Sequence, residues 1–280
     1  MQRLFRLQNV IFLLFAVYLF LYPGSITLVA LDRVPVWGTW MGGALLILQG
    51  TLMGCWLAVN YRWYGVVATG LILFISWLVE HVGATTGFPF GTYTYTDVLQ
   101  PQIFGVVPLA IPFAWLLIVT AAVGVAEQIW IRQNNNDDRR LSITKVLMAA
   151  SFAVLLDITI EPFAVHINHY WVWSNVEPGS YYGIPASNFI AWWITSLILV
   201  WVLLFQRRRA AQQRNRPGQV FWLWLPMTLY ISNLTMFVVV NVARGQVLAG
   251  IVGSLLMLVL AFERFLPHMM RRLRGTSPAQ

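Results

Sequence analysis

The chain has 280 residues, of which 59% are hydrophobic and 10% are charged, and its net charge is +8. The mean hydropathy of +0.68 lies above the usual range of a soluble domain, which indicates a membrane protein. The single cysteine, Cys55, excludes an intrachain disulfide and a thiolate metal cluster.

Apolar runs of the length that crosses a bilayer recur along the whole chain. The first run follows Arg3 and Arg6, but it is too long for the core of a signal peptide and lacks a small-x-small cleavage site. We therefore expect an all-α, polytopic transmembrane helix bundle, a single integral membrane domain over residues 1–280. Its eight helices are expected at 10–31, 38–60, 63–80, 106–131, 144–161, 188–205, 220–240 and 246–265.

The basic residues predict the orientation of these helices. Sixteen of the eighteen Lys and Arg residues fall on one side of the membrane, and only Arg33 and Arg244 fall on the other. The positive-inside rule then predicts a multi-pass protein of the cell membrane with both termini in the cytoplasm. The basic loops are interpreted as contacts with anionic membrane lipids and not with nucleic acid. Residues 275–280 are expected to be a disordered tail.

Two polar segments between the predicted helices, 80–108 and 157–185, contain no Lys or Arg, yet hold five of the ten acids and three of the four histidines. The orientation above places both at the outer face. Because they are rich in Gly, Pro and aromatic residues, we expect irregular or re-entrant structure that folds back against the bundle. An aromatic belt at the headgroup level is the alternative.

The two segments also show a possible parallel internal repeat, with units at 63–131 and 144–205. A shift of 77 positions places Glu80 on Asp157, Tyr93 on Tyr170 and Trp115 on Trp192, together with three further matches. A parallel repeat of this kind predicts a site between the two halves. Chance and shared composition remain alternative explanations.

Three carboxylates stand out as candidates for proton chemistry. Asp157 and Glu161 are four residues apart and share one helix face, Pro162 favours the end of that helix at Glu161, and Glu80 is expected to close the third helix. Burial and the negative end of a helix dipole both favour the neutral form of a carboxyl group, which a general acid requires. Bonding to the backbone of broken helices, or exposure to water, is the alternative role.

Other kinds of site fit poorly. His81, His166 and His169 lie near helix ends, and four histidines in the chain are too few for a membrane di-iron oxygenase. For His166 and His169 a polar interfacial role is favoured over metal binding. The Walker A motif, the glycine fingerprint after a strand, paired Asp-rich motifs and a serine nucleophile elbow are all missing. The remaining hypothesis is acid–base chemistry on a lipophilic substrate, with neither metal nor cofactor.

The two outer segments resemble the carotenoid biosynthesis family of CruF type. The first carries Glu80-His81, Gly87-x-Pro-Phe-Gly-x-Tyr-x-Tyr95 and Gly105-Val-Val-Pro108, and the second carries Asp157-x-x-x-Glu-Pro162, Trp171-x-Trp173 and Gly179-x-Tyr-Tyr-Gly-Ile-Pro-x-x-Asn-Phe189. The resemblance covers about residues 60–265. It implies a carotenoid 1,2-hydratase, a hydro-lyase that adds water to the terminal double bond of an acyclic carotenoid. The implied substrate is lycopene, γ-carotene or a bisanhydrobacterioruberin-like carotenoid.

Residue roles then follow from the chemistry of hydrating a trisubstituted alkene, which begins with protonation and leaves a tertiary cation. Glu80 or Asp157 is expected to be the acid, with Glu161 or its partner activating water, and Asn188 and His81 positioning that water. Six aromatic residues are expected to bind the substrate and stabilise the cation: Tyr93, Tyr95, Trp171, Trp173, Tyr181 and Tyr182.

Three alternatives stay open on the sequence alone. Another isoprenoid enzyme, a cyclase or an isomerase, also begins by protonating an alkene. A non-catalytic carotenoid- or lipid-binding protein would use the same aromatic residues without needing clustered acids. A proton-coupled transporter would need the acids and the repeat, but the sequence shows no polar residues spaced along a path to the cytoplasmic side.

Overall fold

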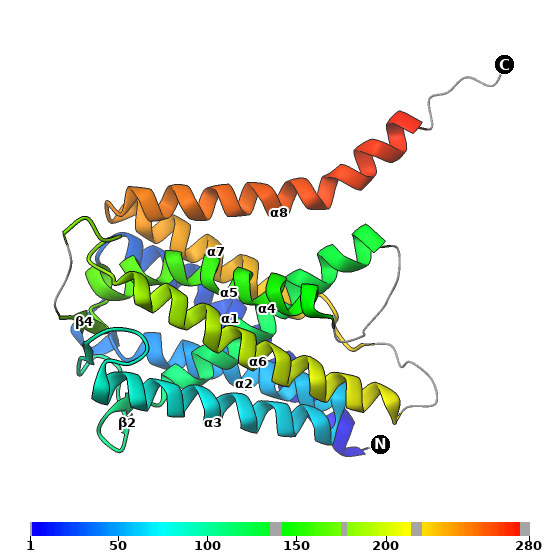
Figure 1. Ribbon diagram of the computed structural model, residues 1–280, viewed down its shortest axis with the longest axis horizontal. Helices are drawn as coiled ribbons and strands as arrows, with labels where there is room; N and C mark the ends of the chain where they lie inside the picture. The colour runs from blue at the N-terminus through cyan, green and yellow to red at the C-terminus, as the bar shows by residue number, and fades with distance from the viewer. Residues whose placement is uncertain (1, 135–141, 175–177, 214–219, 275–280) are drawn as a thin grey trace.

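The computed structural model describes residues 2–134, 142–174, 178–213 and 220–274, which form an all-α bundle of long helices (Figure 1). The helices are α1 (Gln2–Ala30), α2 (Met41–Tyr61), α3 (Trp63–Thr86), α4 (Ala110–Asn134), α5 (Ile143–Pro162), α6 (Ala186–Gln212), α7 (Leu225–Ala243) and α8 (Val247–Arg274). A short 3-10 helix, η1 (Val36–Gly38), precedes α2, and a π-helical turn, η2 (Phe163–Ile167), follows α5. The expected bundle of about eight helices is confirmed.

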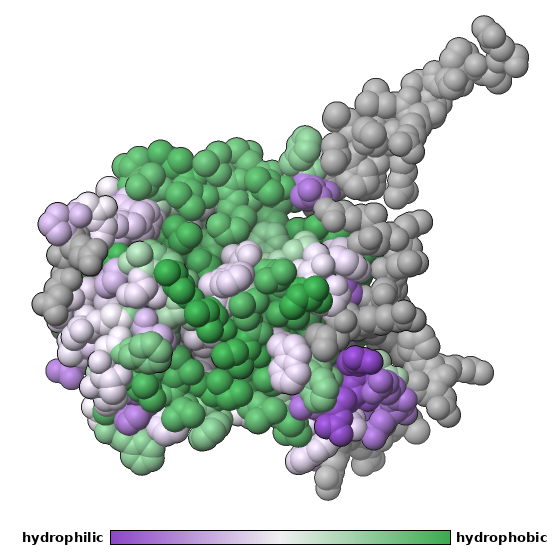
Figure 2. Space-filling view, in the orientation of Figure 1, coloured by the Kyte–Doolittle hydropathy of each residue, from purple (hydrophilic) through white to green (hydrophobic). Residues whose placement is uncertain are grey.

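The helices make a multi-pass membrane protein. In the described part of the chain, seven of them are long and apolar enough to cross a bilayer, and α8 adds an apolar stretch at Val247–Glu263. Large apolar side chains such as Phe20 and Phe262 are exposed on the surface. Figure 2 shows a broad band of hydrophobic side chains over the middle of the visible face, with polar residues gathered at its two ends. This distribution suits a molecule surrounded by lipid.

Helix α4 is the centre of the bundle and α1 is its periphery. The apolar stretch of α4 has 89% of its residues buried, against 11% for that of α1. Helix α4 packs against α2, α3, α5 and α7. The contact with α2 is close at Gly50, where an added Cβ would lie 2.5 Å from the carbonyl oxygen of Phe113. Small residues at such contacts let helix backbones approach in the absence of a hydrophobic driving force.

At one end of the bundle, the two outer segments fold back onto the helices, as expected. They also contain short strands that the sequence did not predict: β1 (Tyr93–Tyr95), β2 (Gln102–Ile103), β3 (Val107–Pro108) and β4 (Trp171–Trp173). Strand β2 pairs with β3, and β1 pairs with β4 in an antiparallel ribbon that joins the two segments. Phe90 and Leu99 are each 1% exposed, so the loop around β1 is part of the core.

The third helix is longer than predicted, and Glu80 does not close it. Helix α3 continues to Thr86 and ends at Gly87, whose φ of 79° terminates the helix while its N–H donates to the Gly83 carbonyl. Glu80 therefore lies inside the helix, where the expected effect of the helix end does not apply. Helix α4 begins later than predicted, because Val107 and Pro108 are held in β3.

Helix α5 changes form at Pro162 without stopping there. Pro162 has no N–H for the carbonyl of Ile158 one turn earlier, and the chain continues as the π-helical turn η2, closed by the N–H of Asn168 on the carbonyl of Phe163. The hydroxyl of Tyr181 donates instead to the Ile158 carbonyl at 3.0 Å. Tyr181, which was expected to bind substrate, thus supplies the hydrogen-bond donor that Pro162 lacks.

The first residues of α1 and the last of α8 lie at the same end of the bundle, and the strands lie at the other (Figure 1). Arg33 and Arg244, the two basic residues expected on the outer side, lie just after the ends of α1 and α7. The cytoplasmic location of both termini stays a prediction.

Candidate active site

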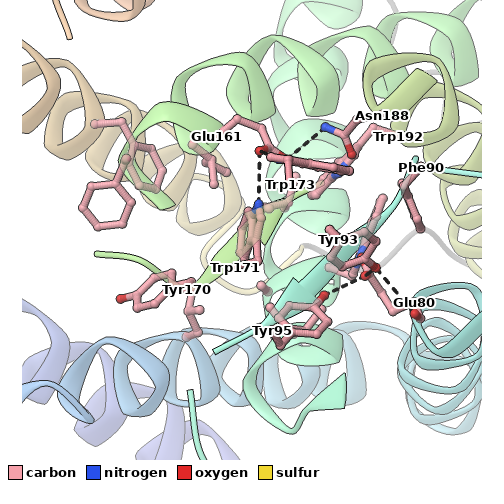
Figure 3. Close-up of a pocket in the computed structure, with 18 residues that line it drawn as sticks. Glu80, Phe90, Tyr93, Tyr95, Glu161, Tyr170, Trp171, Trp173, Asn188 and Trp192 are labelled. Atoms are coloured by element: carbon pink, nitrogen blue, oxygen red, sulfur yellow. Dashed lines mark hydrogen bonds between the residues drawn. The ribbon is translucent and has the colours of Figure 1, made fainter. Parts of the chain in front are cut away.

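A cavity of about 80 Å³ lies under the β1–β4 ribbon, between α3, α4, α5 and α6. Its polar groups are chiefly two carboxyl groups, Glu80 from α3 and Glu161 from α5, and its wall is otherwise largely aromatic (Figure 3). The residues that line it include no Lys, Arg or His. The volume is several times what one water molecule needs.

Three donors hold the Glu80 carboxyl group. The hydroxyls of Tyr93 and Tyr95 both donate to Oε2 at 2.7 Å, and the indole N–H of Trp115 on α4 donates to Oε1 at 2.8 Å. Glu80 is 5% exposed. These bonds are as short as those typical of a charged acceptor.

Three donors hold the Glu161 carboxyl group in the same way. The indole N–H groups of Trp171 and Trp173 donate to Oε2, both at 3.2 Å, and the side-chain amide of Asn188 on α6 donates to Oε1 at 2.9 Å. Glu161 is 1% exposed. Its two indole bonds are at the long end of the usual range.

The two carboxyl groups are therefore bound in one pattern. Each carboxyl group lies on a helix and accepts three hydrogen bonds. Two come from alternate residues of the strand that follows the helix, and the third comes from a residue of the next helix. Successive side chains of a strand point to opposite faces, so both Tyr residues of Tyr-x-Tyr and both Trp residues of Trp-x-Trp face the cavity. Thr94 and Val172, between them, are exposed. This pattern matches Glu80 with Glu161, whereas the 77-residue offset matches Glu80 with Asp157.

Stacked and edge-on rings form the walls between the two carboxyl groups. The rings of Trp115 and Trp192 stack with centroids 3.8 Å apart, and those of Tyr93 and Trp173 lie 5.0 Å apart across the ribbon. Burial and the charge of Glu80 raise the pKa of Tyr93 and of Tyr95 well above the usual value of a phenol. Both hydroxyls therefore act as neutral donors.

Asp157 is placed elsewhere. It is 0% exposed and lies one turn before Glu161 on α5, but it does not line the cavity. Neither of its carboxyl oxygens has a hydrogen-bond partner among the described residues. The structure thus brings Glu80 and Glu161 together at the cavity and leaves Asp157 behind it.

His81, Tyr181 and Tyr182 also lie outside the cavity lining. His81 follows Glu80 on the helix, so its ring turns away and packs on Trp77 at 5.4 Å. The hydroxyl of Tyr182 accepts the backbone N–H groups of Leu248 and Ala249 in the first turn of α8. Their predicted roles in water positioning and substrate binding have no support from these positions.

Several lining residues were not among the predicted site residues, notably Phe90, Trp115, Tyr170 and Trp192. A signal for Trp115 and Trp192 was present, because the proposed repeat places one on the other. Phe90 is the Phe of the motif Gly87-x-Pro-Phe-Gly-x-Tyr-x-Tyr95, and it reaches the cavity because its loop folds inward. Among the described residues, no group of three or more His, Cys, Asp or Glu side chains could hold a metal ion.

Fold and site together define a polytopic helical membrane protein with two buried carboxyl groups in an aromatic cavity. The sequence profile of the carotenoid biosynthesis protein family matches residues 41–260, and the chain belongs to that family. The match includes every residue that lines the cavity.

The chain is also similar to the bisanhydrobacterioruberin hydratase of Haloarcula japonica, with 30% identity over 183 residues. The matched region covers 62% of this chain and 59% of that relative's length. No solved structure matches the chain.

Proposed function

We propose that the protein is a carotenoid 1,2-hydratase, which adds water across the terminal 1,2 double bond of an acyclic carotenoid. The observation that carries the proposal is the pair of buried carboxyl groups, Glu80 and Glu161, facing one aromatic cavity. Hydration needs one group to give a proton to the alkene and another to take one from water. Membership of the family and the name of the Haloarcula japonica relative support the substrate class and the reaction.

The sequence favours Glu80 or Asp157 as the acid and Glu161 as the group that activates water, but from the geometry we assign the acid to Glu161 and the base to Glu80. The short bonds from Tyr93, Tyr95 and Trp115 favour the ionised form of Glu80, whereas the long indole bonds to Glu161 suit a neutral group. A carboxyl group has about four positions for hydrogen bonds. Three are filled on each glutamate, which leaves one on Glu161 for the proton and one on Glu80 for water.

In the first step, the proton of Glu161 moves to the less substituted carbon of the terminal double bond. The π electrons form the new C–H bond and leave a tertiary cation on the neighbouring carbon. The N–H groups of Trp171, Trp173 and Asn188 stabilise the charge that Glu161 gains. Ring faces such as those of Trp173 and Tyr93 stabilise the cation by roughly 0.5–2 kcal/mol each.

In the second step, water attacks the cation and Glu80 takes its proton, so that a tertiary alcohol forms. The reaction consumes no net proton, because Glu80 gains the one that Glu161 lost. A proton transfer from Glu80 to Glu161, carried by water in the cavity, restores the starting state. This cycle needs neither metal nor cofactor. The substrate reaches the site from the membrane, which we propose is the cell membrane, with both termini in the cytoplasm and the site near the outer face.

The proposal is tested by expressing the chain in a lycopene-producing host grown with oxygen-18 water and measuring carotenoid masses. Gain of labelled water is the expected result. Unlabelled oxygen would mean oxygenation, and an unchanged mass with altered absorbance would mean cyclisation or isomerisation; either rejects the hydratase.

Variants then test the residues. Glu161→Gln and Glu80→Gln should each lower the hydration rate at least about 100-fold, the usual contribution of a general acid or base. The matched control is Asp97→Asn, because Asp97 lies in the same outer segment but is exposed. Near-normal turnover in both Gln variants, with the protein present in the membrane, would reject the mechanism.

A further inference from the structure

A second, larger cavity lies beside the first. Its volume is about 600 Å³, and it is bounded by α1, by the turn and first residues of α2, and by the segment that follows η2. Its wall along α1 is largely apolar, with Leu21, Gly24 and Leu28, and its lining also includes His169 and the ion-paired Asp32 and Arg244. None of the residues in the catalytic assignment above lines it.

Tyr170 separates the two cavities, because it lines both of them. Its backbone is fixed on both sides: its N–H donates to the Ala164 carbonyl, and its carbonyl accepts the N–H of Thr96. Its hydroxyl accepts the side-chain amide of Asn168 at 2.7 Å and points at Gly42, where an added Cβ would overlap it. Tyr170 is the one residue common to the two linings, so its side chain is the natural gate between the cavities.

The small cavity cannot hold a whole carotenoid. An acyclic carotenoid is a long, linear polyene, and about 80 Å³ accommodates little more than its end group with water. The rest of the molecule therefore needs an apolar path that begins at the site. The larger cavity adjoins the site at Tyr170, and one of its walls is α1, the least buried of the seven membrane-spanning helices described.

We propose that this larger cavity binds the polyene chain of the substrate next to its reactive end, and that the substrate enters from the bilayer past α1. This inference rests on the proposed function for the identity of the substrate. The chain passes Tyr170 to bring its terminal double bond between Glu161 and Glu80. The part of the polyene beyond the cavity lies in the lipid.

Gly24 offers a direct test. Gly24 lines the cavity and an added Cβ there would meet no atom within 4 Å, so Gly24→Leu is expected to place its side chain in the open space of the cavity, and Leu is also the better helix former. The matched control is Gly70→Leu, because Gly70 on α3 is equally open but lines neither cavity. Both changes add the same side chain to an exposed helix position.

The measurement is the affinity of the protein for lycopene in lipid nanodiscs, monitored through the absorption spectrum of lycopene. All variants are made in a Glu161→Gln background, so that lycopene is not consumed during the titration. We expect Gly24→Leu to weaken lycopene binding at least tenfold and Gly70→Leu to change it less than twofold. Unchanged binding in Gly24→Leu, equal loss in both variants, or no binding by the parent protein would overturn the inference. If Gly24→Leu abolishes lycopene binding but the parent protein adds no labelled water to lycopene, the binding cavity is upheld and the hydratase is rejected.

Discussion

Replacement of Asn188 by Leu tests the assignment of the acid most sharply. The change removes the amide that donates to Glu161 at 2.9 Å and keeps the volume of a buried side chain that is 2% exposed. When Glu161 gives up its proton it gains a full charge, and a hydrogen bond to a charged group contributes about 1.5–3 kcal/mol. The same bond to the neutral acid contributes about 0.5–1.5 kcal/mol, so its loss costs the transition state about 1–1.5 kcal/mol more than the ground state and lowers kcat by about 5- to 13-fold.

The assay is the initial rate of lycopene hydration in nanodiscs at several lycopene concentrations. We expect kcat to fall and KM to stay nearly constant, because the bond strengthens as the proton leaves and changes little when the substrate binds. Asn241→Leu is the matched control, since Asn241 is also buried and donates at 2.8 Å, but to the Thr159 carbonyl, and does not line the cavity. A folded Asn188→Leu protein with the kcat of the parent would refute Glu161 as the acid.

Three further predictions concern stability. Gly50→Ala should lower the thermal unfolding midpoint in detergent, because its Cβ would lie 2.5 Å from the Phe113 carbonyl oxygen; an unchanged midpoint would contradict the close α2–α4 contact. Arg207→Met should destabilise the fold by about 3–5 kcal/mol, because it leaves the buried Glu127 without its ion-pair partner at 2.8 Å. Adding Glu127→Leu to the Arg207→Met protein should restore most of this free energy of unfolding, as measured by denaturant titration. Burial raises the pKa of Tyr170 from 10.0 to about 12, so the unfolded chain loses this proton first and the folded state loses up to about 2.7 kcal/mol between pH 10 and 12. The unfolding midpoint of Tyr170→Phe should fall less steeply over that range than that of the parent.

Hydropathy was sufficient to predict the bundle. Seven described helices long enough to span a membrane fall close to the predicted ranges, because apolar runs in lipid have to satisfy their backbone bonds as helices. The ends of the helices were harder to predict. Helix α3 runs six residues past Glu80, since the local signal for its end is Gly87 and not the acid. Ribbon β1–β4 pairs residues 76 to 80 positions apart and has no local signature.

For the site, polarity within an apolar chain drew attention to Glu80 and Glu161, and both line the cavity. Asp157 shows the limit of that reasoning. Its spacing from Glu161 predicts a shared face, yet one turn of helix separates a residue inside the cavity from one behind its wall. Tyr181 and Tyr182 show a second limit, because aromatic hydroxyls in such segments also serve backbone groups, here those of α5 and α8. Which carboxyl group carries the proton is still a proposal.

The bonds around the carboxyl groups also imply an order of assembly. The three donors to Glu80 are 13, 15 and 35 residues away in sequence, and those to Glu161 are 10, 12 and 27 residues away. Each carboxyl group can therefore find its donors soon after its own pair of helices enters the membrane, before the remainder of the chain is synthesised. Only the ribbon requires both pairs. Each buried acid can thus be hydrogen-bonded before the two halves meet, and the two acids face one cavity only when the second helical pair docks on the first.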